Sequence, residues 1–130
     1  MRQKIRVVGA IIEQDGKVLI TQRPPKAVLP LLWEFPGGKV EPDETDEQAL
    51  ARELREELEI EVVVGERATE STHSYPQYDI DFAVYRCRIV GGEIVHRAVR
   101  DHRWVRTAEL SQYEFPPADE ATISMLLGLG

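Results

Sequence analysis

The chain has 130 residues, of which 42% are hydrophobic and 30% are charged, and its formal net charge is −7. This length and composition predict one globular domain, residues 1–130, with a core of useful size. The negative charge argues against a DNA or RNA polymer as partner, because phosphate backbones require clustered Lys and Arg. A small phosphorylated ligand stays possible, since bound cations can reverse the local field.

The single cysteine, Cys87, lies in an alternating apolar run, so we expect it to pack in the core. One cysteine cannot form an internal disulfide, which fits a reducing cytoplasm. No stretch approaches the ~18 apolar residues of a membrane span. The apolar run at residues 7–12 follows basic residues but is too short for a signal peptide and has no cleavage-like site after it. We therefore expect a cytoplasmic protein without a membrane partner, either a monomer or a homodimer.

The first third of the chain predicts strands and loops. β-branched residues 5–12 indicate a buried strand, and residues 17–21 answer it across an Asp-Gly turn signal, so a hairpin is expected. Residues 22–32 contain three prolines and no periodicity, which predicts a loop. Residues 33–35 are expected to form a short strand or extended piece that leads into a Pro-Gly-Gly turn at 36–38.

Residues 45–58 predict a helix. Thr45 and Gln48 have the spacing of a capping box, which satisfies free N–H groups at a helix start. A step of about 100° per residue gives this helix a leucine seam and an adjoining carboxylate arc. The seam contains Leu50, Leu54 and Leu58, and the arc contains Glu53, Glu56 and Glu57.

The rest of the chain predicts a strand-rich half with a closing helix. Residues 78–89 alternate, with Ile80, Phe82 and Val84 on one face and Ala83, Tyr85, Cys87 and Ile89 on the other, so both faces should be covered. Shorter strands are expected at 62–64 and 103–105, a hairpin return at 93–95 after a Gly-Gly turn, a helical turn at 107–110 and a helix at 120–127. Together these elements predict a mixed sheet flanked by helices, an α/β or α+β sandwich.

The carboxylate arc needs a physical reason, because like charges three or four residues apart on a helix cost about 0.2–0.5 kcal/mol per pair. Hard divalent cations take oxygen ligands, and two such ions can clamp a phosphoryl group and activate a water. The alternative is a solvated acidic face balanced by Arg52 and Arg55.

The context of the arc resembles the Nudix box. Gly38, then Glu44, then Arg52-Glu53-Leu54-x-Glu56-Glu57-x-x-Ile60 follow its spacing, with one departure: Glu59 stands where the box usually has glycine. Such glycines end helices in a left-handed conformation, which costs another residue roughly 1 kcal/mol. Over nearly its whole length the chain is similar to the MutT branch of Nudix hydrolases, which implies a Nudix-type α/β/α sandwich.

The resemblance implies a role for each box residue. Mg²⁺ or Mn²⁺ is expected to be held by Glu53, Glu56, Glu57 and the backbone carbonyl of Gly38. Glu53 matches the proposed general base. Arg52 matches the residue that orients the glutamates, and Glu44 matches an outer carboxylate.

A second departure lies outside the box. Relatives of this branch often carry a further glutamate where this chain has Ala98. Asp101, Glu44 or water would then complete the coordination. His96 and His102 are close in sequence but are not assigned as ligands, because the chemistry of the site is oxygen-based.

The resemblance also implies substrate contacts. Arg23 and Lys39 match positions that approach substrate phosphates; the alternatives are a solvent charge at a strand end and a partner for the box acids. Phe35, Tyr75 and Tyr78 are candidates to line a base pocket, or are plain core aromatics. Asp119 lies where MutT carries an asparagine that pairs with 8-oxoguanine, and the alternative is an N-cap for the last helix.

The activity implied is hydrolysis of a nucleoside triphosphate to the monophosphate and pyrophosphate, a small-molecule reaction. The first candidate is an 8-oxo-dGTP diphosphatase that cleans the nucleotide pool. Ionised Asp119 only accepts hydrogen bonds and faces O6 of 8-oxoguanine unless it is protonated, so a (d)CTP or 5-methyl-dCTP pyrophosphohydrolase is a rival. A hydrolase of ADP-ribose or another nucleoside diphosphate derivative also remains open. A non-catalytic nucleotide-binding module is disfavoured, because such relatives lose the box glutamates.

Overall fold

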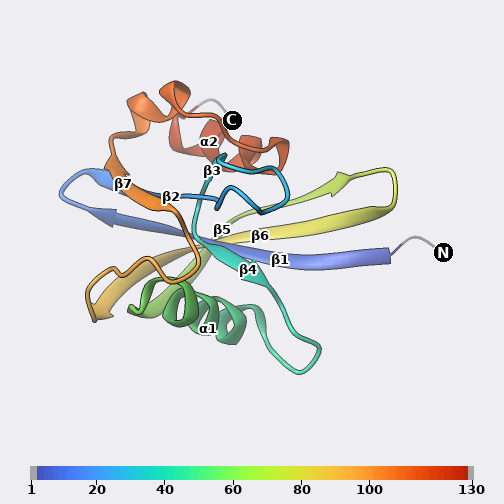
Figure 1. The fold of residues 1–130 in the computed structure, drawn as a ribbon, viewed down its shortest axis with the longest axis horizontal. Coiled ribbons are helices and arrows are strands. Elements are labelled where there is room, and N and C mark those ends of the chain that lie inside the picture. Colours follow the sequence, from blue (N-terminus) through green and yellow to red (C-terminus); the bar gives the residue numbers. More distant parts are fainter. Residues whose placement is uncertain (1–2, 129–130) are drawn as a thin grey trace.

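A seven-stranded mixed sheet lies between two helical layers in the computed structural model, which describes residues 3–128 (Figure 1). The strands are β1 (Gln3–Gln14), β2 (Lys17–Gln22), β3 (Trp33–Glu34), β4 (Gly37–Lys39), β5 (Glu61–Ser74), β6 (Tyr78–Gly91) and β7 (Asp101–Val105). The helices are α1 (Asp46–Leu58), α2 (Glu120–Leu126) and two 3₁₀ helices, Thr107–Gln112 and Pro117–Asp119. Neither α-helix within residues 3–128 has the length and apolar character that crossing a bilayer requires.

β1 is the strand on which the sheet is organised. The strand order is β3-β2-β1-β6-β5, with β4 added on β1 and β7 on β2. β1 runs parallel to β6 over ten residue pairs and antiparallel to β2 and β4. The mixed sheet predicted from the sequence is therefore confirmed.

Two hydrophobic cores fill the two faces of this sheet. On the α1 face, the leucine seam of the helix is fully buried against Tyr85 and Cys87 of β6. On the α2 face, Phe82 and Val84 of β6 pack in a second cluster with Leu110. The alternation predicted for β6 is thus correct, and so is the core position of Cys87.

Both ends of α1 are closed by defined contacts. The capping box predicted at its start is present: Gln48 N–H donates to Thr45 Oγ1 at 3.1 Å, and Thr45 N–H donates to Gln48 Oε1 at 3.0 Å. Glu59 ends the helix with φ 58°, the left-handed conformation that glycine usually adopts at this position. Its carboxylate pairs with Arg97.

The hairpin return expected at residues 93–95 is wrong. β6 already pairs with β1 on one edge and β5 on the other, so no edge is left for a further strand. The segment instead turns to the end of α1, where Val95 N–H donates to Leu58 O and Arg97 N–H donates to Glu57 O, both at 2.9 Å. These bonds satisfy carbonyls that a helix end leaves open.

Two other expectations were too narrow. The short strand expected at 62–64 is the start of β5, a 14-residue strand at the edge of the sheet whose polar second half gives no apolar pattern. The turn expected at 36–38 is partly β4, which pairs with β1. The glycine there serves packing, since a Cβ on Gly37 would overlap the carbonyl oxygen of Val8.

Truncation of the leucine seam tests how strongly α1 depends on the sheet. Leu54→Ala empties a fully buried position and is expected to lower the free energy of unfolding by about 2–5 kcal/mol. Val63→Ala on the exposed edge of β5 is the control, with an expected loss of under about 1 kcal/mol. Urea unfolding of both variants measures the difference, and equal losses would contradict a seam that fixes the helix.

Candidate functional site

Arg52 gathers the carboxylates at one side of α1. Its Nε and Nη2 donate to both oxygens of Glu44 at 2.6 and 2.8 Å, a bidentate pair. Its Nη1 donates to Glu53 at 2.8 Å and to Glu56 at 3.2 Å. Nη2 also donates to the carbonyl oxygen of Lys39 at 3.1 Å, which ties the helix to β4. One guanidinium thus holds three acidic side chains and a strand.

The contact with Arg52 changes the ionisation of Glu44. Hydrogen bonds from Arg52, and then from the backbone N–H of Glu41 at 3.0 Å, lower the pKa of Glu44 to about 2. Glu44 is therefore a fixed negative charge at any physiological pH, suited to orienting the arginine.

β4 passes against the carboxylate of Glu53 at Gly38. A Cβ on Gly38 would overlap the side chain of Glu53, so only glycine allows the strand to come this close. The structure thus places Gly38 beside Glu53, and both were expected from the sequence to hold the cation. Backbone and carboxylate oxygens that meet in this way form a donor set that suits a hard divalent cation.

The helix carboxylates that lie deeper carry raised pKa values. Burial raises the pKa of Glu53, although Arg52 opposes this. Burial, followed by the charges of Glu53 and Glu34, raises the pKa of Glu57 to about 8. Acids crowded in this way attract a cation, because a bound divalent ion reverses the local charge and favours the ionised forms.

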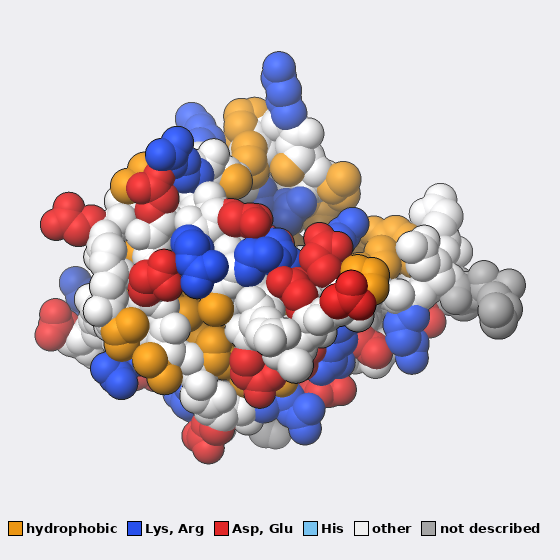
Figure 2. Space-filling model, turned by 90° about the horizontal axis from the view of Figure 1, so that it is seen from below, with side chains coloured by type: hydrophobic (Ala, Val, Ile, Leu, Met, Phe, Trp, Pro, Cys, Tyr) orange, Lys and Arg blue, Asp and Glu red, His pale blue; other side chains and the backbone are white. Residues whose placement is uncertain are grey.

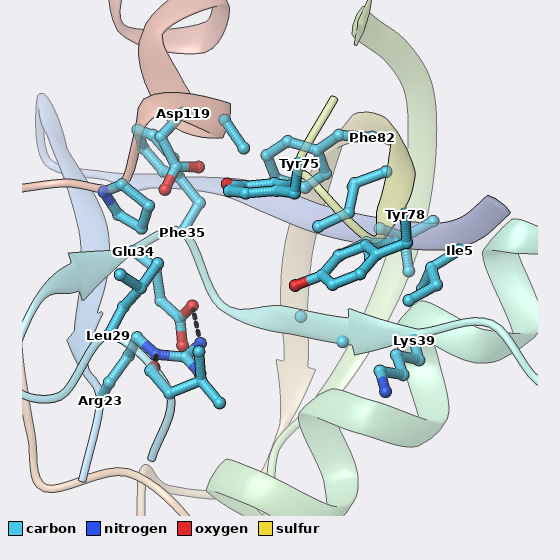
Figure 3. Close-up of a pocket in the computed structure, with 18 of the residues that line it drawn as sticks. Ile5, Arg23, Leu29, Glu34, Phe35, Lys39, Tyr75, Tyr78, Phe82 and Asp119 are labelled. Carbon is cyan, nitrogen blue, oxygen red and sulfur yellow. Dashed lines mark hydrogen bonds and ion pairs between the residues drawn. The ribbon is translucent and has the colours of Figure 1, made fainter. Parts of the chain in front are cut away.

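A pocket of about 610 Å³ opens beside these acids (Figure 3). All six residues predicted to contact substrate line it, and so do Gly38 and Glu57: the six are Arg23, Phe35, Lys39, Tyr75, Tyr78 and Asp119. Figure 3 shows Lys39 near α1 at one end and Asp119 with Tyr75 at the other. The volume falls in the range of small-molecule sites, and the walls are mainly apolar with a few polar groups.

Arg23 is held in the pocket by Glu34 and by the loop that precedes β3. Its Nη1 donates to Glu34 Oε1 at 2.9 Å, and its Nε donates to the carbonyl oxygen of Val28 at 2.7 Å. The alternative interpretation of Arg23, as a solvent-exposed charge at the end of a strand, is therefore wrong. Lys39 lines the same pocket on β4, and its backbone oxygen accepts from Arg52.

The aromatic candidates divide between pocket and core. The rings of Tyr75 and Tyr78 lie 5.4 Å apart between centroids, and both line the pocket. Phe35 is buried, with its ring 5.6 Å from that of Phe115, and also reaches the pocket wall. Phe35 thus belongs to both the pocket and the core.

Asp119 does not cap the last helix. The 3₁₀ helix Pro117–Asp119 runs directly into α2, so Asp119 has helical backbone angles and its side chain makes no capping hydrogen bond. It is 3% exposed, lines the pocket, and its Oδ1 has no hydrogen-bond partner among residues 3–128. Burial, and then the charge of Glu34, raises the pKa of Asp119 well above its usual range. Burial therefore favours the protonated form of the group, which can both donate and accept a hydrogen bond.

Glu34 is the pocket residue that sequence reasoning missed. Glu34 follows Trp33 and precedes Phe35 in the sequence, and its side chain lines the pocket. Its charge influences the pKa values of both Glu57 and Asp119. Burial raises its pKa, while Arg23 opposes that shift. A glutamate between two aromatic residues in a short extended segment is the sequence signal that could have identified it.

His96, Asp101 and His102 form a separate group. Asp101 Oδ1 accepts from the backbone N–H of His102 at 2.8 Å, and Oδ2 lies 3.4 Å from Arg103 Nη2. That Asp101 replaces the glutamate missing at position 98 in cation binding stays a prediction.

On the α1 face, acidic and basic side chains are interspersed rather than gathered by sign (Figure 2).

Comparisons with known proteins agree with this geometry. A family model described as a NUDIX domain matches residues 7–125. A CTP pyrophosphohydrolase of Escherichia coli (strain K12) is 41% identical over 96% of this chain and 93% of the relative. An 8-oxo-dGTP diphosphatase of Haemophilus influenzae is 37% identical over 95% and 91%. The solution structure of MutT from methicillin-resistant Staphylococcus aureus 252 superposes over 100% of both chains with a TM-score of 0.80 and 37% identity.

The raised pKa of Glu57 predicts a pH-dependent stability when divalent cations are removed by a chelator. Between pH 4.5 and about 8 the folded chain keeps a proton that the unfolded chain releases, so the free energy of unfolding falls as pH rises through this window. Glu57→Gln removes this fall. Relative to the parent chain, the variant is expected to gain at least about 1 kcal/mol between pH 5 and pH 8.

Urea unfolding at the two pH values measures this gain. Glu56→Gln is the control for losing one charge on the same helix, since the Glu56 side chain is 59% exposed. Identical pH slopes for the parent chain and Glu57→Gln would contradict the raised pKa.

Proposed function

Because the chain belongs to the Nudix hydrolase family, we propose that it hydrolyses a nucleoside triphosphate to the monophosphate and pyrophosphate with Mg²⁺ or Mn²⁺ as cofactor. The observation that carries this proposal is the shared pocket. Glu57, Gly38 and Lys39 line it near the acids of α1, and Asp119 and Tyr75 line its other end. A triphosphate and its base fit these two ends, respectively.

The donor set supports the cofactor proposal. Enzymes of this family generally use divalent metals. Glu53, Glu56, Glu57 and the Gly38 carbonyl would hold the ion, which would supply charge neutralisation at the phosphates and an acidified water. Oxygen donors and the close approach of Gly38 to Glu53 favour a hard cation over a soft one.

The protein groups would then share the roles in hydrolysis of the anhydride bond between the α and β phosphates. Glu53 accepts the proton of the attacking water, and Arg52 keeps the Glu53 carboxylate in place through the 2.8 Å hydrogen bond. Glu44 anchors Arg52 from the other side. Lys39 and Arg23 bind phosphate oxygens; the guanidinium of Arg23 has five donors, more than its contacts with Glu34 and Val28 use.

Asp119 would read the base. A protonated carboxyl group donates one hydrogen bond and accepts another, as an asparagine amide does. It can meet O6 and N7–H of 8-oxoguanine together, but it meets two acceptors on ordinary guanine. This favours 8-oxo-dGTP as substrate, with Phe35, Tyr75 and Tyr78 against the ring.

Cytosine is the second candidate base, and a specific observation supports it. The same protonated group can donate to N3 and accept from the 4-amino group of cytosine. The relative from Escherichia coli at 41% identity is a CTP pyrophosphohydrolase. A (d)CTP or 5-methyl-dCTP activity is therefore the rival that the experiment must separate.

The proposed setting follows from the same features. We assign residues 1–130 to one domain, since both cores share a single sheet. The substrate is a small nucleotide rather than a nucleic-acid polymer, in keeping with the net charge of −7. A cytoplasmic monomer or homodimer completes the proposal. A non-catalytic binding module does not need the retained glutamates of α1.

Turnover of a substrate panel tests the reaction. With Mg²⁺, kcat/KM is measured for 8-oxo-dGTP, dGTP, dCTP, 5-methyl-dCTP and ADP-ribose. We expect pyrophosphate release, with 8-oxo-dGTP preferred over dGTP by at least tenfold, about 1.4 kcal/mol. Glu53→Gln is expected to lower kcat by about 10²-fold or more at an unchanged unfolding midpoint. Tight nucleotide binding without turnover of any substrate would contradict the proposal that the chain is an enzyme.

Substitution of Asp119 tests base reading. Asp119→Asn keeps a donor and an acceptor, so the ratio of kcat/KM for 8-oxo-dGTP over dGTP should stay within about threefold of the parent value. Asp119→Leu removes both groups and should reduce that ratio at least tenfold, or about 1.4 kcal/mol. A ratio that survives in Asp119→Leu would show that another residue reads the base.

A further inference from the structure

A second group of metal-ligating side chains lies outside the carboxylate helix. His96, Asp101 and His102 each offer one ligand atom, and these atoms all lie within 4.8 Å of one another. The group includes Asp101, which the sequence offered as a replacement for a glutamate at position 98, but none of the proposed Mg²⁺ ligands Gly38, Glu53, Glu56 and Glu57. His96 is exposed and the other two side chains are half-buried, so solvent can reach the group.

The geometry points to a second, transition-metal site at His96, Asp101 and His102 that takes Zn²⁺, Co²⁺ or Ni²⁺ rather than Mg²⁺. His96 Nε2 and His102 Nδ1 lie 2.7 Å apart. Tetrahedral zinc with bonds of 2.0–2.1 Å separates neighbouring nitrogens by about 3.3 Å, so the rings must open by about 0.6 Å to admit the ion. Two imidazoles with one carboxylate suit these metals, whereas Mg²⁺ prefers oxygen alone.

The two imidazole rings point toward each other. At 2.7 Å one ring donates its N–H to the lone pair of the other. Metal binding needs a lone pair on both nitrogens, so the donor ring shifts to its other tautomer and carries its proton on the far nitrogen. The shared hydrogen bond is then exchanged for two coordinate bonds.

Two contacts fix the orientation of the Asp101 carboxylate, the third ligand of the proposed site. Asp101 Oδ1 accepts from the backbone N–H of His102, and Oδ2 lies 3.4 Å from Arg103 Nη2. Hydrogen bonds to a ligating carboxylate fix its orientation, as partners around metal sites generally do. Arg97 pairs with Glu59, and Arg103 lies 5.7 Å from the Trp33 ring centroid, so both cations have partners beside the site.

The site joins two parts of the fold. His96 belongs to the irregular segment at 92–100, and His102 belongs to β7, opposite Thr21 of β2. The neighbours of His96, Val95 and Arg97, donate backbone hydrogen bonds to the last turn of α1. A bound transition metal therefore ties the segment that caps α1 to the sheet, and it is expected to raise thermal stability by binding only the folded chain.

Titration of the whole chain with Co²⁺ in the presence of excess Mg²⁺ tests the site, with visible absorption and calorimetry as readouts. We expect one equivalent to bind with ligand-field bands of mixed nitrogen and oxygen coordination and to raise Tm. His96→Ala and His102→Ala should each weaken Co²⁺ and Zn²⁺ binding at least about tenfold. His73→Ala is the matched control, because His73 is the third histidine and lies on β5.

Two further measurements separate this site from the catalytic one. Glu53→Gln should retain the Co²⁺ bands, and His96→Ala should retain Mg²⁺-dependent turnover. In the parent chain, NMR signals of the His96 and His102 rings should shift with Zn²⁺ while those of His73 do not, which keeps the test valid if a variant folds poorly. Unshifted His96 and His102 signals, or Co²⁺ bands lost in Glu53→Gln but kept in His102→Ala, would overturn the proposal.

Discussion

The guanidinium of Arg52 is the contact on which the site depends. Three acidic side chains share one helix face or its approach, and their mutual repulsion would spread them without a cation between them. Arg52 supplies that cation and also reaches the backbone of β4. The arrangement is rigid because α1 is fixed at both ends: Asp46 at its start accepts from Arg6 and Tyr85, and residues 95–97 cover its end.

Neighbouring carboxyl groups with raised pKa values line the pocket at both of its ends. Glu34 is a neighbour of both Glu57 and Asp119, and each of these three carboxyl groups has a raised pKa. Near α1 this concentration of acid favours a bound cation. Near Asp119, where the group is nearly fully buried, it favours a neutral acid. Carboxyl groups are thus suited to holding a cation at one end of the pocket and to forming neutral hydrogen bonds at the other.

The sequence predicted those parts whose signal is local. α1 was predicted with its cap and seam because capping residues and helical periodicity are read directly from neighbours. The two faces of β6 followed from alternation for the same reason. The extent of β5 could not be read, because an edge strand with a polar second half is defined by its partner. The failure of the hairpin at 93–95 likewise depends on β1, a strand some eighty residues earlier that occupies the open edge of β6.

In the site, the helix acids, Arg52 and the pocket residues were predictable from spacing and resemblance, but the partner of Arg23 was not. The ion pair of Arg23 with Glu34 links the residue that follows β2 to β3, the strand reached after the loop at 23–32.

The left-handed conformation of Glu59 links this residue to Arg97 in a later segment. A non-glycine residue in this conformation costs about 1 kcal/mol relative to glycine. The carboxylate of Glu59 forms an ion pair with Arg97 in the irregular segment that follows β6. Positions 59 and 97 are therefore coupled: glycine at 59 would remove both the cost of the left-handed conformation and the ion pair that Arg97 makes.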